Sequence, residues 1–184
     1  MCGRYYIAAD ERDMAEILEA VEFGAAVKTG EVFPSDPAPV LRSGGVITAM
    51  SWGYPRYDGK GLIINARSET AAEKPMFRRD LAGGRCLVPA SWYYEWEKRR
   101  DSRIRYRLRP REPGPVWLAA LSRREADGAF RFVILTRQAA PGIAFIHDRM
   151  PVILPPRTHD AWLHARDPEA VLRGAEEDIL YAEA

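Results

Sequence analysis

The second half of the chain contains a close succession of short β-prone segments, and this pattern restricts the fold most strongly. After Gly83-Gly84, apolar residues alternate or cluster over residues 86–88, 92–97, 103–109, 116–121 and 130–136. Turn signals such as Pro113-Gly114 and Asp127-Gly128 separate these runs. Many short strands at this spacing indicate a curved antiparallel sheet or an open β-barrel-like core.

The first half and the C-terminal region add helices and a few more strands. We expect strands at residues 3–8, 46–52, 62–66 and 151–154, and a helix capped by Asp10 that runs to about residue 21. The proline-rich residues 34–39 should form an extended loop, because proline has no backbone N–H to donate to the hydrogen bonds of a helix or sheet. Short helical pieces are predicted at 69–73 and 77–82, a helix at 158–165, and an amphipathic helix from Pro168 to the end. The prediction is a single α+β domain over residues 1–184, with peripheral helices.

Charge and cysteine content restrict the class of protein. The 27 Lys+Arg nearly balance the 26 Asp+Glu, so a nucleic-acid site must be a local patch. Residues 99–111 are rich in arginine, which fits such a patch or simply a solvated strand and turn. With only Cys2 and Cys86, a secreted disulfide scaffold is excluded. No apolar signal segment or membrane-length run is visible, and we expect a cytoplasmic protein without a membrane contact.

Cys2 is the first residue with unusual chemical potential. Removal of an initiator Met requires a small second residue, and cysteine meets this requirement, so Cys2 could become the N-terminal residue. Its α-amine, with a pKa near ~8, would condense with an aldehyde, and its thiol would then close a five-membered thiazolidine. The alternative is that Cys2 is an accident of the second codon or a small buried residue of the first strand.

Three further segments carry groups suited to chemistry. Asn65 and Arg67 lie two residues apart on a predicted extended segment and therefore point to the same side. Glu95 stands among the aromatics of residues 92–96, where burial would raise its pKa towards neutrality. His147, beside Asp148 and Arg149, suits general acid–base work. A solvent-facing Glu95 and a structural His147 are the alternatives.

Taken in order along the chain, these segments resemble the SOS response-associated peptidase (SRAP) family, whose members protect abasic sites by DNA–protein crosslinking. The resemblance spans about residues 1–155. The motifs that carry it are Met1-Cys2-Gly3-Arg4, Trp52-Gly53, residues 65–70, residues 92–96 and residues 146–151.

The resemblance implies a role for each matching residue. Cys2 would be the crosslinking nucleophile, Asn65 would position the reacting group, Glu95 would relay protons, and His147 would help to open the deoxyribose ring. The implied DNA contacts are Arg4, Arg67 and Arg149 to phosphates, and Trp52 as a stacking or wedge surface. The implied partner is single-stranded DNA with abasic sites, bound by a monomer.

No metal or cofactor is expected from the sequence. His147, His159 and His164 show no ligand spacing with one another or with the two cysteines. His159 and His164 stand five residues apart on a predicted helix and therefore do not share a face.

The chain also departs from the family pattern. Glu31 stands where a neutral polar residue is usual, and it would repel a phosphate if that position approaches DNA. The chain is also expected to lack the segment that longer members carry after the helix near Trp162. Two other functions stay open: a cysteine-type peptidase or self-peptidase using Cys2, His147 and Asn65, and a non-catalytic single-stranded DNA-binding module.

Overall fold

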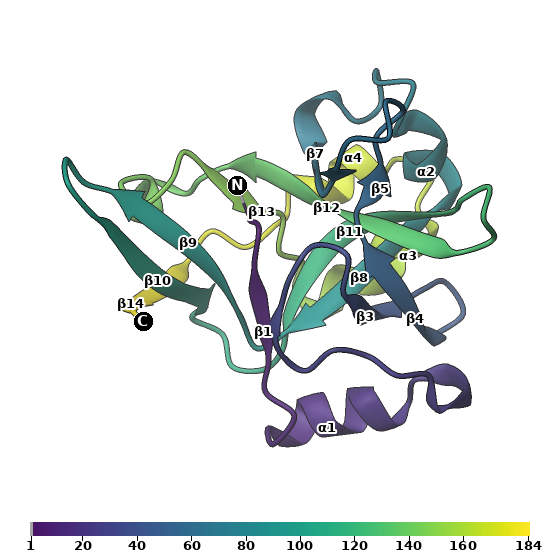
Figure 1. Ribbon diagram of the computed structural model, residues 1–184, viewed down its shortest axis with the longest axis horizontal. Helices are drawn as coiled ribbons and strands as arrows, with labels where there is room; N and C mark the ends of the chain where they lie inside the picture. Colours follow the sequence, from purple (N-terminus) through teal and green to yellow (C-terminus); the bar gives the residue numbers. More distant parts are fainter. Residues whose placement is uncertain (1) are drawn as a thin grey trace.

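A closed five-stranded barrel forms one half of the protein in the computed structural model, which describes residues 2–184. The barrel order is β11-β8-β3-β4-β12, and pairing of β12 with β11 closes it (Figure 1). The two long hairpin strands β11 and β12 are antiparallel, whereas β12 and β4 run parallel. The predicted α+β fold with a barrel-like core is confirmed, and the barrel is closed and contains one parallel pair among its strands. The bounds of these strands are Pro37–Leu41 (β3), Ile47–Trp52 (β4), Arg85–Ala90 (β8), Val116–Arg124 (β11) and Phe130–Gln138 (β12).

A second, five-stranded antiparallel sheet packs beside the barrel in the order β14-β10-β9-β1-β2. Its β9–β10 hairpin extends away from the barrel at the left of Figure 1. Because β1 lies between β2 and β9, the N-terminal segment is held in the middle of the molecule. The bounds are Tyr5–Ile7 (β1), Gly30–Val32 (β2), Trp92–Lys98 (β9), Arg103–Pro110 (β10) and Ile179–Glu183 (β14).

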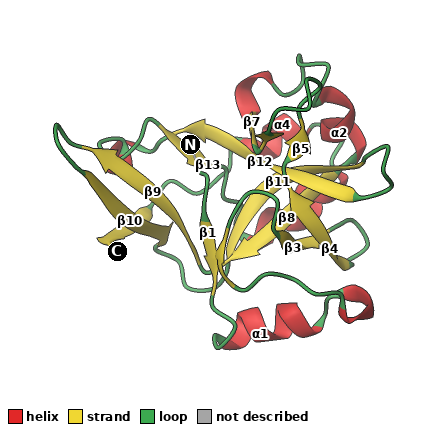
Figure 2. Cartoon of the chain, in the orientation of Figure 1, coloured by secondary structure: helices red, strands yellow, loops and turns green. Residues whose placement is uncertain are grey.

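The helices are short and lie at the periphery, as predicted (Figure 2). None of the helices within residues 2–184 has the length and apolar character needed to cross a membrane. The remaining strands are short: β7 joins the edge of β12, β13 pairs with the end of β12, and β5 and β6 form a separate ribbon. The bounds are Arg12–Glu19 (α1), Arg78–Gly83 (α2), His159–His164 (α3), Pro168–Leu172 (α4), Tyr54–Pro55 (β5), Leu62–Ile63 (β6), Asn65–Arg67 (β7) and Arg149–Pro151 (β13).

The largest apolar cluster includes residues from both sheets. Cys2, Tyr5 and Tyr93 from the five-stranded sheet pack in the same cluster as Trp52 and Phe132 from the barrel. A second cluster, built around Trp162, includes barrel residues such as Leu121 and Leu135. The N-terminal residues therefore belong to the core and are not a loose tail.

Two sequence predictions of secondary structure were wrong. Residues 34–39 were expected to form a loop, but Pro37 and Pro39 begin β3, opposite Ser51 and Ala49 of β4. The backbone N–H groups of every second residue in a strand point to the same neighbouring strand. Pro37 and Pro39 are two residues apart, so the hydrogen-bond donors that they lack are missing on one edge of β3 only. The partner on the other side, β8, meets β3 only at Leu41.

The C-terminal amphipathic helix also ends much earlier than predicted. Helix α4 stops at Leu172, and residues 179–183 form β14 against β10. The sequence Ile-Leu-Tyr-Ala-Glu has the β-branched and aromatic residues that fit a sheet, and the edge of β10 gives it a partner. Tertiary pairing therefore overrides the helical periodicity seen in the sequence.

Candidate active site around Cys2

Cys2 lies at the entry to β1 and is completely buried in the full chain. The side-chain amide of Asn65 donates a hydrogen bond to the Cys2 carbonyl oxygen over 2.8 Å. Asn65 itself is held on β7, paired with Ile134 of β12. The barrel thereby fixes the main chain of Cys2, although the two residues are far apart in sequence.

Glu95 reaches the same place from β9. The ladder between β1 and β9 pairs Tyr5 with Tyr93, and continuing this register places Gly3 opposite Glu95. Glu95 is only 4% exposed, and burial raises the pKa of its carboxyl group to about 7. The group is therefore able to hold or release a proton near neutral pH.

His147 belongs to the loop that leads into β13. Its Nδ1 atom lies 2.7 Å from a carboxylate oxygen of Asp148 and accepts a hydrogen bond from the Arg149 N–H over 3.0 Å. These two contacts need opposite protonation states of Nδ1. Burial lowers the pKa of His147, which favours the neutral ring.

The charges of Glu95 and Asp148 act on the neighbouring titratable groups of this site. Burial raises the pKa of the Cys2 thiol well above its usual range, and the charge of Glu95 raises it further. The carboxylate of Asp148 in turn contributes to the raised pKa of Glu95. The thiol is thus held neutral in this state.

Tyr5 and Tyr93 are polar residues of this site that sequence reasoning missed. Both hydroxyl groups are buried and have no hydrogen-bond partner among residues 2–184. The pKa of each is raised, first by burial and then by the charge on Cys2. The alternation of side chains along β9 could have revealed Tyr93, because this residue lies two positions from Glu95 and therefore faces the same side.

Arg4 and Glu31 form a charged group beside this site. The Arg4 guanidinium lies 3.4 Å from Glu31 and 4.1 Å from the centre of the Phe33 ring. The other carboxylate oxygen of Glu31 is 2.7 Å from Arg105. Two arginines therefore compensate the negative charge that was expected to repel phosphate, which leaves a net positive group.

The family of the chain is decided by its match to a family model. The model described as "SOS response associated peptidase (SRAP)" matches residues 1–181. The chain belongs to the SRAP family. The resemblance stated from the motifs is confirmed, and it extends beyond residue 155.

Named relatives of this SRAP chain cover most of its length. The abasic site processing protein YoqW of Bacillus subtilis is 32% identical over 189 residues, which are 91% of this chain and 82% of that protein. The abasic site processing protein YedK of Escherichia coli is 30% identical over 184 residues, 89% of this chain and 79% of that protein. The crystal structure of a Bordetella bronchiseptica protein is 25% identical, with a TM-score of 0.80, and the match covers 100% of this chain and 99% of that one.

The structure gives Arg149 of this SRAP chain a different role from the predicted phosphate contact. Its guanidinium makes a two-pronged ion pair with Glu69 at 2.6 and 2.8 Å and also donates to the Thr136 carbonyl oxygen at 2.7 Å. This pairing lowers the pKa of Glu69 to about 2. Arg149 therefore ties the His147 loop to the turn after β7, and it would have to leave Glu69 to bind a phosphate. Arg67, in contrast, is exposed.

Trp52 of this SRAP chain is not at the surface, so the predicted base-stacking role does not fit the structure. Its side chain is fully buried, with its ring 5.1 Å from Tyr5 and stacked at 6.3 Å on Phe132. The indole N–H donates to the Ile64 carbonyl oxygen over 3.0 Å. Trp52 supports the floor of the site from within the core.

We expect Trp52→Phe to affect stability and not DNA binding. The change removes the hydrogen bond to Ile64 and some packing, so the free energy of unfolding should fall by about 1–3 kcal/mol. Affinity for single-stranded DNA should stay within about twofold, a difference below 1 kcal/mol. Urea unfolding and fluorescence anisotropy measure the two quantities. Weaker DNA binding with unchanged stability would restore the stacking role.

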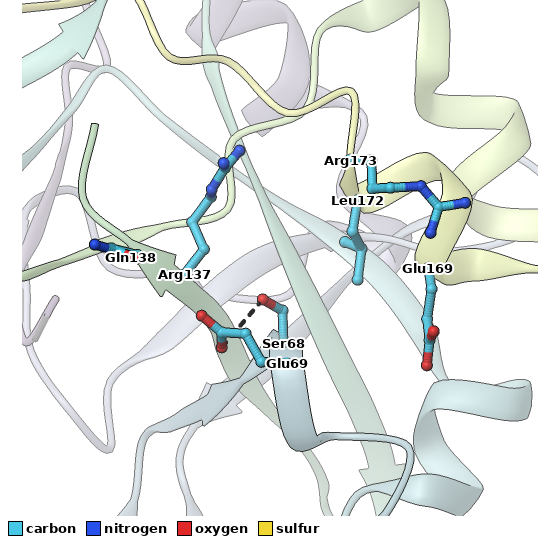
Figure 3. A pocket seen from close by; sticks show the side chains of 7 residues that line it. All are labelled: Ser68, Glu69, Arg137, Gln138, Glu169, Leu172 and Arg173. Atoms are coloured by element: carbon cyan, nitrogen blue, oxygen red, sulfur yellow. Dashed lines mark hydrogen bonds between the residues drawn. The ribbon is translucent and has the colours of Figure 1, made fainter. Parts of the chain in front are cut away.

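A surface pocket of about 360 Å³ lies beyond the turn that follows β7, between that turn and α4 (Figure 3). Its lining residues are Ser68, Glu69, Arg137, Gln138, Glu169, Leu172 and Arg173. It includes none of Cys2, Asn65, Glu95 and His147, and its Arg137 pairs with Glu177 at 2.6 Å. The pocket is therefore separate from the Cys2 site. Within residues 2–184 no group of three His, Cys, Asp or Glu residues is placed to hold a metal ion.

Proposed function

We propose that the chain captures abasic sites in single-stranded DNA covalently, through a thiazolidine formed by Cys2 after removal of Met1. The relatives named abasic site processing proteins support abasic sites as the target. The single observation that carries the chemistry is the hydrogen bond from Asn65 to the Cys2 carbonyl. It holds the future N-terminal residue beside Glu95, a buried carboxyl group with a pKa of about 7.

The reaction proceeds in two bond-forming steps. The neutral α-amine of Cys2 adds to the aldehyde carbon of the ring-opened deoxyribose, and loss of one water gives an imine. The thiol sulfur then adds to the carbon of the protonated imine and gives up its proton, which closes the thiazolidine. The raised pKa of the buried thiol suits this order, because the sulfur stays protonated until the imine is in place.

Glu95 and His147 supply the proton transfers. Protonated Glu95 donates to the hydroxyl that leaves as water, and the resulting carboxylate accepts the proton released on ring closure. Neutral His147 takes the proton of the C1′ hydroxyl as the C1′–O4′ bond breaks and returns it to the ring oxygen, which opens the sugar ring. Burial of Glu95 next to Cys2, which raises its pKa to about 7, and the lowered pKa of His147 support these roles near neutral pH.

The test is a denaturing gel of Met-processed protein mixed with single-stranded DNA that contains one abasic site. We expect a heat-stable shifted band whose intact mass equals protein plus DNA minus one water. Undamaged DNA of the same sequence is the control and should give no band. Absence of a band from protein that is shown by mass to begin at Cys2 would overturn the proposal.

Replacing Asn65 should slow capture without removing any reacting atom. In Asn65→Ala the carbonyl of Cys2 loses its hydrogen bond and the amine is no longer held in position. We expect the crosslinking rate to fall by about ten- to a hundredfold, because misplacement by about 1 Å has effects of this size. Single-turnover gel kinetics at saturating DNA measure the rate, and a rate equal to wild type would remove Asn65 from the mechanism.

The peptidase alternative fits this geometry less well. In a Cys–His–Asn site the asparagine oxygen orients the histidine. Here Asn65 Oδ1 has no hydrogen-bond partner among residues 2–184, and the amide nitrogen of Asn65 donates to the Cys2 carbonyl oxygen. Chemical blocking of the α-amine with the thiol left free separates the two activities, since a peptidase would survive it. A purely non-catalytic DNA-binding module would retain DNA only under native conditions.

A further inference from the structure

The outer face of the five-stranded sheet, on the side opposite Glu95, alternates aromatic and basic side chains. Along β9 the residues that share a side with Glu95 point to the core, so Trp92, Tyr94 and Trp96 lie on the other side of the sheet. Trp92 and Trp96 are partly exposed there, whereas Tyr94 is buried, with the Arg105 guanidinium over its ring. In the β9–β10 register Trp96 stands opposite Arg105 and Tyr94 opposite Arg107. We call this surface the outer face and define it by its side chains from β1, β9, β10 and β14. They are Arg4, Tyr6, Trp92, Tyr94, Trp96, Lys98, Arg103, Arg105, Arg107, Arg109, Leu180 and Ala182.

The aromatic rings of the outer face form a continuous row. The Tyr6 and Trp92 rings are stacked, with centres 4.4 Å apart. Trp92 meets Tyr94 at 6.5 Å, and Tyr94 meets Trp96 at 6.4 Å. Trp92 and Trp96 remain partly exposed, so ring surface is available at both ends of the row.

The charge of the outer face is strongly positive, although the whole chain has a net charge of only +1. Arg103 and Arg107 are exposed and have no ion pair within residues 2–184. The Arg105 guanidinium lies over the Tyr94 ring at 4.7 Å. The acidic neighbours include Glu31, which Arg4 and Arg105 already neutralise, Glu11 at the β14 end, and Asp101 in the turn between β9 and β10.

A groove of about 470 Å³ opens at the β14 end of this face. Trp92 and Leu180 give it apolar walls, Arg107 and Arg109 give it two positive charges, and Glu11 lies at its rim. An apolar wall beside guanidinium groups fits a nucleotide, whose base is apolar on its faces and whose phosphate is negative.

We propose that the outer face binds the single strand of DNA that flanks the captured lesion. Aromatic rings stack on unpaired bases of any sequence, and interleaved arginines bind the phosphates between them. Arg4 connects the two sites, since it lies two residues from Cys2 and its guanidinium is 5.3 Å from the centre of the Trp96 ring. The inference rests on the proposed function in one respect, which is that the outer face and the Cys2 site would bind the same DNA strand.

The experiment measures non-covalent binding alone. Protein with Cys2→Ala is titrated with undamaged oligothymidine of about 20 nucleotides, longer than the ~4–16 that one sheet-based site covers. The double variant Arg103→Glu/Arg107→Glu should bind at least about tenfold more weakly at ~0.1 M salt. The neutral pair Arg103→Gln/Arg107→Gln should reduce the slope of log affinity against log salt by about 1.4, or ~0.7 per lost phosphate contact.

Matched controls separate this surface from general electrostatics. Arg79→Glu/Arg166→Glu makes the same change in net charge at two exposed arginines outside the outer face and should leave affinity within about twofold. Trp96→Leu should weaken binding by about fivefold or more through loss of stacking, which charge alone does not explain. Circular dichroism and thermal unfolding check that each variant is folded.

The outcomes distinguish this inference from the proposed function. Equal affinity of the parent and the outer-face variants, or an equal loss in the Arg79/Arg166 control, would overturn the inference even if wild-type protein crosslinks abasic DNA. Loss confined to the outer-face variants supports it, even if wild-type protein forms no covalent product. If binding is lost only in the outer-face variants and wild-type protein forms no covalent product, the proposed capture is wrong and the proposed binding surface is supported.

Discussion

Replacing Cys2 with alanine is expected to abolish the heat-stable crosslink to abasic DNA, with a loss of at least about a hundredfold in product. Alanine at position 2 also allows removal of Met1, so an α-amine remains and can still form an imine. The imine hydrolyses on denaturation because there is no sulfur to close the ring. The chemistry therefore needs both nucleophiles of one residue, which no internal cysteine offers.

Two companion variants locate the loss within the reaction. In Cys2→Ser the hydroxyl is a far weaker nucleophile than sulfur, so no heat-stable band is expected, whereas borohydride reduction before denaturation should trap the imine. Cys86→Ala removes the only other thiol, which is also buried but lies in the barrel on β8, and it should crosslink like wild type. A heat-stable band from Cys2→Ala, or its loss in Cys86→Ala, would contradict the assignment of Cys2.

The strands of the second half were predictable because each is short, alternating and bounded by turn residues. The sequence also indicated that Cys2, Asn65, Glu95 and His147 act together, because their motifs match a family pattern. Pairing partners were not predictable from local sequence. Residues 37–41 and 179–183 form strands because they pair with β4 and β10, respectively.

Local sequence also could not predict which side chains are buried or already paired. Trp52 lies next to a glycine in a family motif and was expected at the surface, but Tyr5 and Phe132 enclose it. Arg149 was expected to contact phosphate, but Glu69, eighty residues away, takes its guanidinium. Tyr5 and Tyr93 were not predicted because only the pairing of β1 with β9 brings them together near Cys2.

Glu95→Gln should slow crosslinking by about a hundredfold, the lower end of the usual contribution of general acid–base catalysis. The pH profile should change as well. In the wild type the rate should rise with pH as the α-amine, with a pKa near ~8, becomes neutral. It should then be limited above pH 7, because Glu95 loses the proton needed to expel water. The variant should keep the rising limb and lose the inflection near 7.

Glu97→Gln is the matched control for this profile. Glu97 lies two residues further on the same side of β9, but it pairs with Arg99 at 3.0 Å, which keeps the pKa of its carboxyl group below the usual value. Its replacement should leave the inflection near pH 7 in place. If Glu95→Gln retained that inflection, the titrating group would be another residue, and His147 would be the first to replace.

The same pKa shift predicts a difference in stability. A carboxyl group whose pKa is higher in the folded state than in the unfolded chain stabilises the fold below pH 4.5, and this contribution is lost as pH rises through 7. The wild type should therefore lose on the order of 3 kcal/mol between pH 4 and pH 8 relative to Glu95→Gln, at about 1.4 kcal/mol for each pKa unit. Urea unfolding of both proteins at these two pH values measures the difference. Slower capture together with this gain in stability relative to the wild type between pH 4 and pH 8 is the result expected if buried Glu95 carries the catalytic proton.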